Sequence, residues 1–151
     1  MAIRATLCYI VKDGKVLFIR KKRGIGQGKL NGPGGKVEMN EDLIESVKRE
    51  VKEEVGVDVI DPRALGEIDF YFGDRFEWKV YIFKSDEFTG VEKETDEAKP
   101  IWFDVGQIPF HEMWPDDRYW LPLLLGNKKF KGVFHYDGKA ENLLRHELKE
   151  L

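Results

Sequence analysis

Three glutamates gather in one short segment of the chain, Glu50, Glu53 and Glu54. If the segment is helical, residues three or four apart are neighbours, and like charges so placed repel by roughly 0.2 to 0.5 kcal/mol per pair. Only Arg49 offers a compensating charge nearby along the helix. Carboxylate oxygens on one rigid face suit Mg²⁺ or Mn²⁺, which keep open positions for water and substrate phosphates. Taken alone, the cluster is equally consistent with an ordinary acidic helix face.

A glycine-rich stretch precedes this cluster, in residues 24–28 and again in residues 31–35. It holds too many glycines for a regular element, and glycine lets a backbone approach a ligand closely. The stretch is therefore interpreted either as a flexible loop or as half of a binding site.

Residues 40–55 have the pattern of an amphipathic helix. Asn40 is the expected N-cap, and Gly56 is expected to end the helix. Acidic Glu41 and Asp42 suit the first turn because they face the positive end of the helix dipole. An apolar stripe should pack on a sheet, with the three glutamates beside it, near the border of the core. The stripe consists of Leu43, Ile44, Val47, Val51 and Val55.

The sequence predicts mainly strands in the rest of the chain. Residues 5–11 and 15–20 flank Asp13-Gly14, a dipeptide typical of a hairpin turn. Further strands are expected at 64–72, 77–84, 100–103 and 129–136, and helices at 115–125 and, in the tail, at 140–151. This order of elements predicts an α/β protein, with a mixed sheet covered by helices on both faces.

The composition excludes several classes of protein. A length of 151 residues, 42% hydrophobic and 35% charged, predicts a single folded domain over residues 1–151. The net charge of −3 argues against DNA or RNA as the main partner but allows a small phosphate ligand. No apolar run approaches the roughly 20 residues that cross a bilayer, so we expect no membrane partner and a cytoplasmic protein. Cys8 lies in an apolar run and is expected to be a buried, inert thiol.

The spacing of residues 35–57 resembles a complete Nudix box. Five residues separate its first glycine from its first glutamate, and seven separate that glutamate from its arginine. Its fixed positions are Gly35, Glu41, Arg49, Glu50, Val51, Glu53, Glu54, Gly56 and Val57. The resemblance implies a Nudix hydrolase, with an α/β/α sandwich around a mixed sheet. It also implies that Arg49 orients a glutamate. The implied metal ligands are the Gly34 carbonyl and the carboxylates of Glu50, Glu53 and Glu54.

The likeness extends over most of the chain, from Thr6 to about Tyr136. The segments that carry it are 21–24, 31–37, 96–103, 108–110, 113–117 and 119–120. They resemble the MutT-type enzymes that sanitise oxidised purine triphosphates, such as the animal 8-oxo-dGTP diphosphatase. In the implied substrate site, Asn31, Asp116 and Asp117 read the purine edge, Trp114 stacks on the base, and Thr6 and Phe70 line the pocket. Gly34 and Gly35 bring backbone to the substrate, and Lys21 meets phosphate.

Plainer interpretations of these residues remain open. Asp116 and Asp117 follow Pro115 and could cap a helix N-terminus. Trp114 and Trp120 could be core residues, and Lys21-Lys22 could be a solvated strand end. Ile25 and Leu30 replace aromatic residues of the animal enzyme, so the pocket entrance is expected to lose aromatic surface.

The implied reaction is Mg²⁺-dependent hydrolysis of a nucleoside triphosphate to the monophosphate and pyrophosphate, with Mn²⁺ as a possible substitute. Either Glu50 or Glu97 is available as the base that activates water. A monomer with a small-molecule nucleotide as its partner is expected. Two other functions remain open: hydrolysis of another nucleoside diphosphate derivative, such as ADP-ribose or a dinucleoside polyphosphate, and nucleotide binding without turnover.

Overall fold

The computed structural model describes residues 2–151, in which strands outnumber helices. Within that range, neither α-helix has the length and apolar character needed to span a bilayer. The strands are β1 (Ile3–Lys12), β2 (Lys15–Lys21), β3 (Leu30–Asn31), β4 (Gly34–Lys36), β5 (Asp58–Ile60), β6 (Arg63–Phe72), β7 (Arg75–Ser85), β8 (Glu87–Thr89), β9 (Ala98–Asp104), β10 (Phe130–Tyr136) and β11 (Leu143–Glu150). The helices are α1 (Leu43–Val55), a 3₁₀ turn (Phe110–Glu112) and α2 (Asp117–Leu125).

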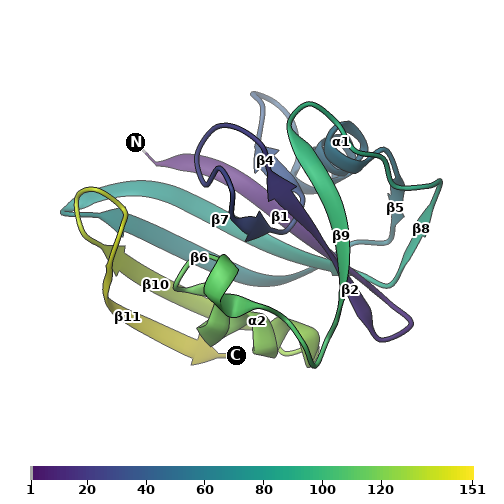
Figure 1. The fold of residues 1–151 in the computed structure, drawn as a ribbon. Coiled ribbons are helices and arrows are strands. Elements are labelled where there is room, and N and C mark those ends of the chain that lie inside the picture. Colours follow the sequence, from purple (N-terminus) through teal and green to yellow (C-terminus); the bar gives the residue numbers. More distant parts are fainter. Residues whose placement is uncertain (1) are drawn as a thin grey trace.

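The main sheet is mixed, and β1 is its central strand (Figure 1). β1 runs parallel to β7 and antiparallel to β4, and its last residues form the predicted hairpin with β2. β6 forms a hairpin with β7 and lies parallel to β10, so the order continues outward as β7, β6, β10 and β11. On the other side, β2 pairs with β3 and β9.

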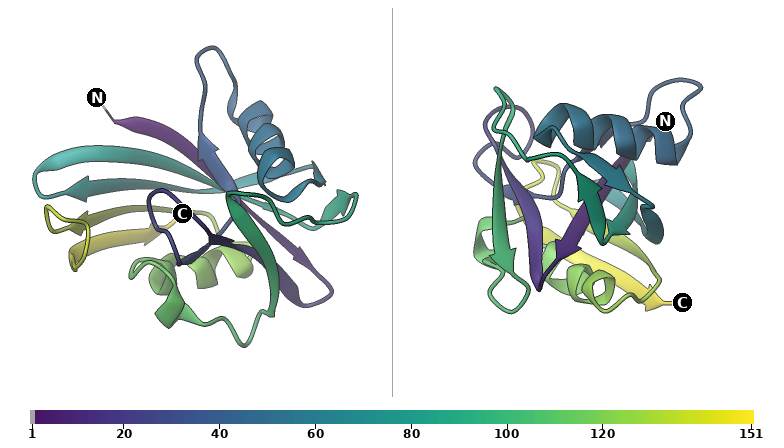
Figure 2. Two further views of the ribbon diagram at one scale, coloured as in Figure 1. Left: turned by 45° about the horizontal axis from the view of Figure 1, so that its top comes forward. Right: turned by 90° about the vertical axis from the view of Figure 1, so that its right-hand side faces the viewer.

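The two helices cover opposite sides of the strands (Figure 2). Successive residues of a strand point to opposite faces. Tyr9 of β1 therefore joins the cluster under α2, whereas its neighbours Cys8 and Ile10 join the cluster under α1. Because the middle of β1 is buried on both faces, residues 7–11 form a continuous apolar run. The α/β class and the mixed sheet with helices on both faces are confirmed.

Helix α1 begins later than expected. Asn40 has a left-handed backbone, with φ of 64°, which is incompatible with the extended conformation of an N-cap. Asp42 caps the helix instead and accepts a hydrogen bond of 2.8 Å from the Glu45 N–H. Gly56 ends the helix as predicted, with φ of 78°. Of the predicted stripe, Val47, Val51 and Val55 are buried, Leu43 is half-buried, and Ile44 is 39% exposed, so the stripe is narrower than expected.

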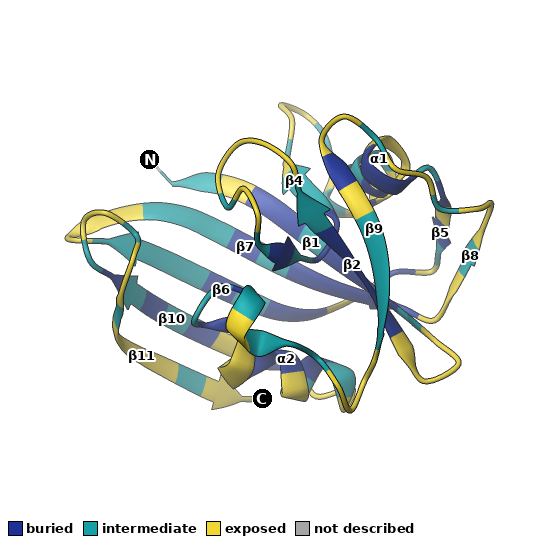
Figure 3. Cartoon of the chain, in the orientation of Figure 1, coloured by how far each residue is buried: buried dark blue, intermediate teal, exposed yellow. Residues whose placement is uncertain are grey.

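The prediction of a helical tail was wrong, because residues 143–150 form strand β11 at the edge of the sheet. Most of β11 is exposed (Figure 3), which explains its polar composition. Short strands were also missed: β3 and β4 lie within the glycine-rich stretch, and β5 pairs with β8. The expected helix at 115–125 starts two residues later, at Asp117.

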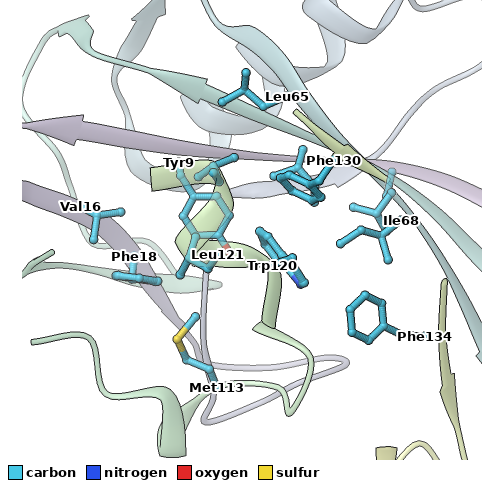
Figure 4. Close-up of a cluster of buried hydrophobic side chains, with 14 of the residues drawn as sticks. Tyr9, Val16, Phe18, Leu65, Ile68, Met113, Trp120, Leu121, Phe130 and Phe134 are labelled. Carbon is cyan, nitrogen blue, oxygen red and sulfur yellow. The ribbon is translucent and has the colours of Figure 1, made fainter. Parts of the chain in front are cut away.

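The core under α2 is strongly aromatic (Figure 4). Trp120 is 1% exposed and packs between Tyr9 and Phe130, with ring centroids 5.8 Å from each. Its core-packing interpretation is therefore confirmed. On the other face Cys8 is buried, and burial raises the pKa of its thiol to about 12, which makes the thiolate inaccessible at neutral pH.

Candidate active site

One cavity of about 430 Å³ opens between β1, β4, the ends of β6 and β7, and the start of α2. All residues that the sequence predicted to contact substrate line it, and two of the four predicted metal ligands, Gly34 and Glu54, are among the lining residues. These residues are Thr6, Lys21, Asn31, Gly34, Gly35, Glu54, Phe70, Trp114, Asp116 and Asp117. Residues more than one hundred positions apart in the chain are thus brought to one site by the sheet and α2.

Glu54 is the buried carboxylate of α1, with 5% of its surface exposed. Its Oε1 accepts a hydrogen bond of 2.7 Å from the Gly34 N–H, which ties the helix to the glycine-rich stretch. Burial raises the pKa of Glu54 to about 7, although this hydrogen bond and the charge of Lys21 oppose the shift. Glu50 and Glu97 add negative charge in the same direction. Ionisation of Glu54 in this cavity is therefore unfavourable unless a cation binds beside it.

Glu50, one turn earlier in the helix, lies against the adjacent residue of the same strand, Gly35. A Cβ added at Gly35 would come within 2.5 Å of the Glu50 carboxyl carbon, so any larger residue would displace this carboxylate from its position. Burial raises the pKa of Glu50, and the neighbouring Arg49 opposes that shift. Glu53, in contrast, is 60% exposed.

Arg49 organises the acidic cluster. Its guanidinium donates to Glu41 at 2.7 Å, to Glu50 at 2.7 Å and to Glu53 at 3.4 Å. It also donates to the Lys36 carbonyl of β4 at 3.0 Å. These contacts lower the pKa of Glu41 to about 2, so Glu41 is a permanent anion that holds the arginine in place. The sequence placed Glu41 in the box and in the first helical turn, but it lies before the N-cap Asp42, and its ion pair with Arg49 was not predicted.

The carboxylates of α1 fit a divalent cation by their chemistry. Across residues 2–151, no three acidic, histidine or cysteine side chains are drawn together into a closed metal cage. Glu50 is turned toward Arg49, and Glu54 toward Gly34. Both have raised pKa values, because each is desolvated and repelled by other acids. Hard oxygen donors whose negative charge is only partly compensated are what Mg²⁺ or Mn²⁺ binds.

Arg49, Glu50, Glu53 and Glu97, which were all predicted to take part in catalysis, lie outside the cavity lining, as does Lys22. Glu97 is 62% exposed and is held at 3.4 Å by Arg23. Lys22 donates to Glu94 and to the Thr95 carbonyl, the latter at 2.7 Å, so it anchors the acidic loop. The neighbouring Lys21 lines the cavity. The lysine pair is thus divided, and only Lys21 faces the site.

The opposite end of the cavity holds two buried acids, Asp116 and Asp117, which are 3% and 2% exposed. Asp116 occupies the N-cap position of α2, but its side chain makes no capping hydrogen bond, so the capping interpretation was wrong. It accepts instead from the Trp120 indole at 2.7 Å and from the Tyr136 hydroxyl. Within residues 2–151, Asp117 Oδ2 is the buried side-chain atom left without a hydrogen-bond partner.

Aromatic side chains form the walls of the cavity. Trp114 meets the Tyr136 ring edge-on at a centroid distance of 6.0 Å, and Lys29 Nζ lies 5.3 Å from the Trp114 ring. The sequence missed Phe72, Trp78 and Tyr136, which also line the cavity. Phe72 could have been found, because it shares a strand face with Phe70; Trp78 and Tyr136 carry no local signal.

Of the two apolar residues expected at the pocket entrance, only one lines the cavity. Ile25 is 64% exposed and lines the cavity. Leu30 is fully buried in the core and is absent from the lining, because β3 pairs with β2 and turns this side chain inward.

Comparison with known proteins agrees with this geometry. Residues 1–124 match the NUDIX domain family. The chain is 42% identical to the oxidized purine nucleoside triphosphate hydrolases of Danio rerio and Mus musculus, over 97% of its length and 94% of theirs. A MutT protein structure from Bacillus halodurans superimposes with a TM-score of 0.87 at 30% identity, covering 97% of both chains. On its sequence and on its fold, the chain belongs to the Nudix family.

Proposed function

We propose that this protein is a Mg²⁺-dependent pyrophosphohydrolase that converts an oxidised purine nucleoside triphosphate into the monophosphate and pyrophosphate. One observation carries the proposal. The unpartnered Oδ2 of Asp117 and the buried carboxylate of Glu54 line the same cavity. The first calls for a hydrogen-bonding ligand group, and the second calls for a cation. A nucleotide with bound Mg²⁺ satisfies both at once.

The base would bind at the Asp117 end. Burial makes an unsatisfied polar atom costly, by about 1 to 3 kcal/mol, so a ligand that pairs with Asp117 gains that amount. The Asn31 amide can both donate and accept, and Trp114 offers an aromatic face for stacking. Thr6 and Phe70 complete the walls. This combination suits a planar heterocycle with a polar edge.

The phosphates would lie toward α1. Hydrolases of this family generally need a divalent metal ion, and we propose Mg²⁺, with Mn²⁺ as a substitute. The Gly34 carbonyl, Glu50, Glu53 and Glu54 would hold it. Bound Mg²⁺ supplies positive charge that stabilises the charge developing on the phosphates. Lys21 adds a cation at the cavity wall.

Side chains of this protein would accept the proton that the attacking water loses. A water molecule attacks phosphorus, the bond between the α-phosphate and its bridging oxygen to the β-phosphate breaks, and pyrophosphate leaves. The attacking water must lose a proton, and Glu50 or Glu97 would accept it. Arg49 keeps Glu50 oriented through the 2.7 Å hydrogen bond. All of these groups belong to one chain, so we propose that a monomer is sufficient for the reaction. We also propose that the protein is cytoplasmic.

The names of the relatives support the nucleotide-sanitising function. A more distant relative, 32% identical over 66% of this chain, is the ADP-ribose pyrophosphatase of Methanocaldococcus jannaschii. ADP-ribose and dinucleoside polyphosphates therefore belong in the test.

Release of pyrophosphate and monophosphate from deoxynucleoside triphosphates, measured with and without Mg²⁺, tests the proposal. Glu54→Gln should nearly abolish turnover while the variant stays folded. Glu45→Gln is the matched control, because Glu45 is an exposed glutamate of the same helix outside the cavity. Full activity of Glu54→Gln, or turnover that is independent of divalent metal, would refute the proposal.

A further inference from the structure

The two adjacent buried acids, Asp116 and Asp117, differ in their hydrogen bonds. Both oxygens of Asp116 accept hydrogen bonds, Oδ1 from the Tyr136 hydroxyl and Oδ2 from the Trp120 indole N–H at 2.7 Å. Asp117 Oδ2 has no partner within the described chain, residues 2–151, although it is equally buried. The difference decides which carboxyl can carry a proton.

The direction of the Tyr136 hydrogen bond follows from its second contact. The Tyr136 oxygen accepts the Asp116 backbone N–H at 3.1 Å, so its own hydrogen is left for the Asp116 carboxylate. Burial and the charge of Asp116 raise the pKa of Tyr136, which keeps the hydroxyl protonated. The Trp120 indole can only donate. Two fixed donors therefore converge on Asp116.

A proton on Asp116 would face one of these donors and lose a hydrogen bond. A proton on Asp117 Oδ2 meets no donor. Burial raises the pKa of both acids, and the negative charge of Asp116 raises that of Asp117 further. The other ionisable groups nearby are Tyr9, which is itself buried and neutral, and Lys29, whose charge opposes the shift at Asp117. One proton on this pair would therefore reside on Asp117, where the geometry offers it no competing donor.

We propose that Tyr136 is a positioning residue for base recognition: with Trp120 it keeps Asp116 an ionised acceptor, which leaves Asp117 as the neutral acid that contacts the base. This inference rests on the proposed function. It specifies which edge of the base contacts Asp117. A neutral carboxyl offers one donor and one acceptor, so it pairs with a base edge that presents an acceptor beside a donor. An ionised carboxylate could pair only with two adjacent donors.

Two oxidised nucleotides separate these cases. The edge of 8-oxo-dATP, with N1 and the 6-amino group, fits only the neutral acid. The edge of 8-oxo-dGTP offers O6 beside N1–H for a neutral acid, and N1–H beside the 2-amino group for a carboxylate. Tyr136→Phe removes one donor from Asp116, so the proton can move there and leave Asp117 ionised. A hydrogen bond to a charged group corresponds to about one pKa unit, or about tenfold.

The ratio of kcat/KM for 8-oxo-dATP to that for 8-oxo-dGTP should therefore fall about tenfold in Tyr136→Phe. The loss should appear in KM for 8-oxo-dATP, with kcat nearly unchanged, because base pairing lies far from the reacting phosphorus. The pH at which kcat/KM falls should rise by about one unit, because Asp116 becomes more basic. Tyr71→Phe is the matched control: Tyr71 lies on the neighbouring strand, packs on His135 and Phe76, and does not line the cavity. It should change neither ratio nor pH profile.

Carbon-13 NMR of aspartate-labelled protein tests the inference without any turnover. At neutral pH, one buried carboxyl should be protonated in the wild type, and Asp117→Asn should remove its signal. Persistence of that signal in Asp117→Asn would place the proton on Asp116 and overturn the inference. So would an unchanged substrate ratio and pH profile in folded Tyr136→Phe. If no nucleotide is hydrolysed at all, the proposed function fails, and the NMR result still decides where the proton resides.

Discussion

Replacing Glu54 with glutamine should make the protein more stable at alkaline pH while it abolishes activity. The buried carboxylate has a pKa of about 7, against an ordinary value of 4.5, mainly because burial disfavours its charged form. Glutamine has nearly the same shape, carries no charge and can still accept the 2.7 Å hydrogen bond from the Gly34 N–H. The substitution therefore removes the charge and little else.

The magnitude follows from the shift in pKa. Between pH 4.5 and about 7 the unfolded chain has released the Glu54 proton and the folded chain has not, so stability falls as pH rises through this window. The shift is worth about 3 kcal/mol once the pH exceeds both values. For a protein of this size, that corresponds to a change in Tm of roughly 6 to 12 °C.

Thermal unfolding of wild type and Glu54→Gln at pH 5 and pH 8, with EDTA and then with Mg²⁺, measures this effect. In EDTA the two proteins should have similar Tm values at pH 5, and the variant should be the more stable at pH 8. Mg²⁺ should raise the Tm of the wild type at pH 8 and narrow the gap, because it neutralises the buried charge. Glu87→Gln, at an exposed glutamate outside the cavity, should follow the wild type throughout.

A Glu54→Gln variant that is no more stable than the wild type at pH 8 in EDTA would refute this reasoning. It would mean that Lys21 and the surrounding backbone already compensate the charge, and that Glu54 does not require a metal ion.

Other substitutions give separate expectations. Asp117→Asn should raise KM or change base preference with kcat largely retained; unchanged kinetics across a purine panel would remove it from base recognition. Gly35→Ala should lower kcat at least about tenfold, because its Cβ would displace the Glu50 carboxylate, and wild-type kcat in a folded variant would count against that contact. Lys21→Ala should raise KM for the triphosphate, whereas Lys22→Ala should leave it unchanged; equal effects would contradict the division of the lysine pair.

Local patterns predicted the elements that carry the chemistry. The apolar positions of α1 and the glycine that ends it are set by interactions within one or two turns, so sequence alone locates the helix. Its first turn was misplaced because Asn40 and Asp42 are both good caps, and only the backbone at Asn40 decides between them. The acids of α1 and the glycines they pack against also lie close together in sequence.

Contacts between distant segments escaped prediction. The residues of β11 are good helix formers, yet they pair with β10 because that strand would otherwise be left with an open edge. In the sequence, Tyr136 has the pattern of an ordinary strand residue. Its contact with Asp116 forms only because β10 lies beside the start of α2. The family resemblance supplied the roles of Asn31 and Asp117, which no local pattern indicates.

The most direct test of the central claim is steady-state product release with Mg²⁺ from 8-oxo-dGTP, 2-hydroxy-dATP, the ordinary deoxynucleoside triphosphates, ADP-ribose and diadenosine polyphosphate. A kcat/KM for an oxidised purine at least about tenfold above that for its unmodified counterpart is predicted, since pairing with buried acids separates related bases by this much or more. Turnover confined to ADP-ribose or the dinucleotide, or no turnover of any compound, would contradict the account.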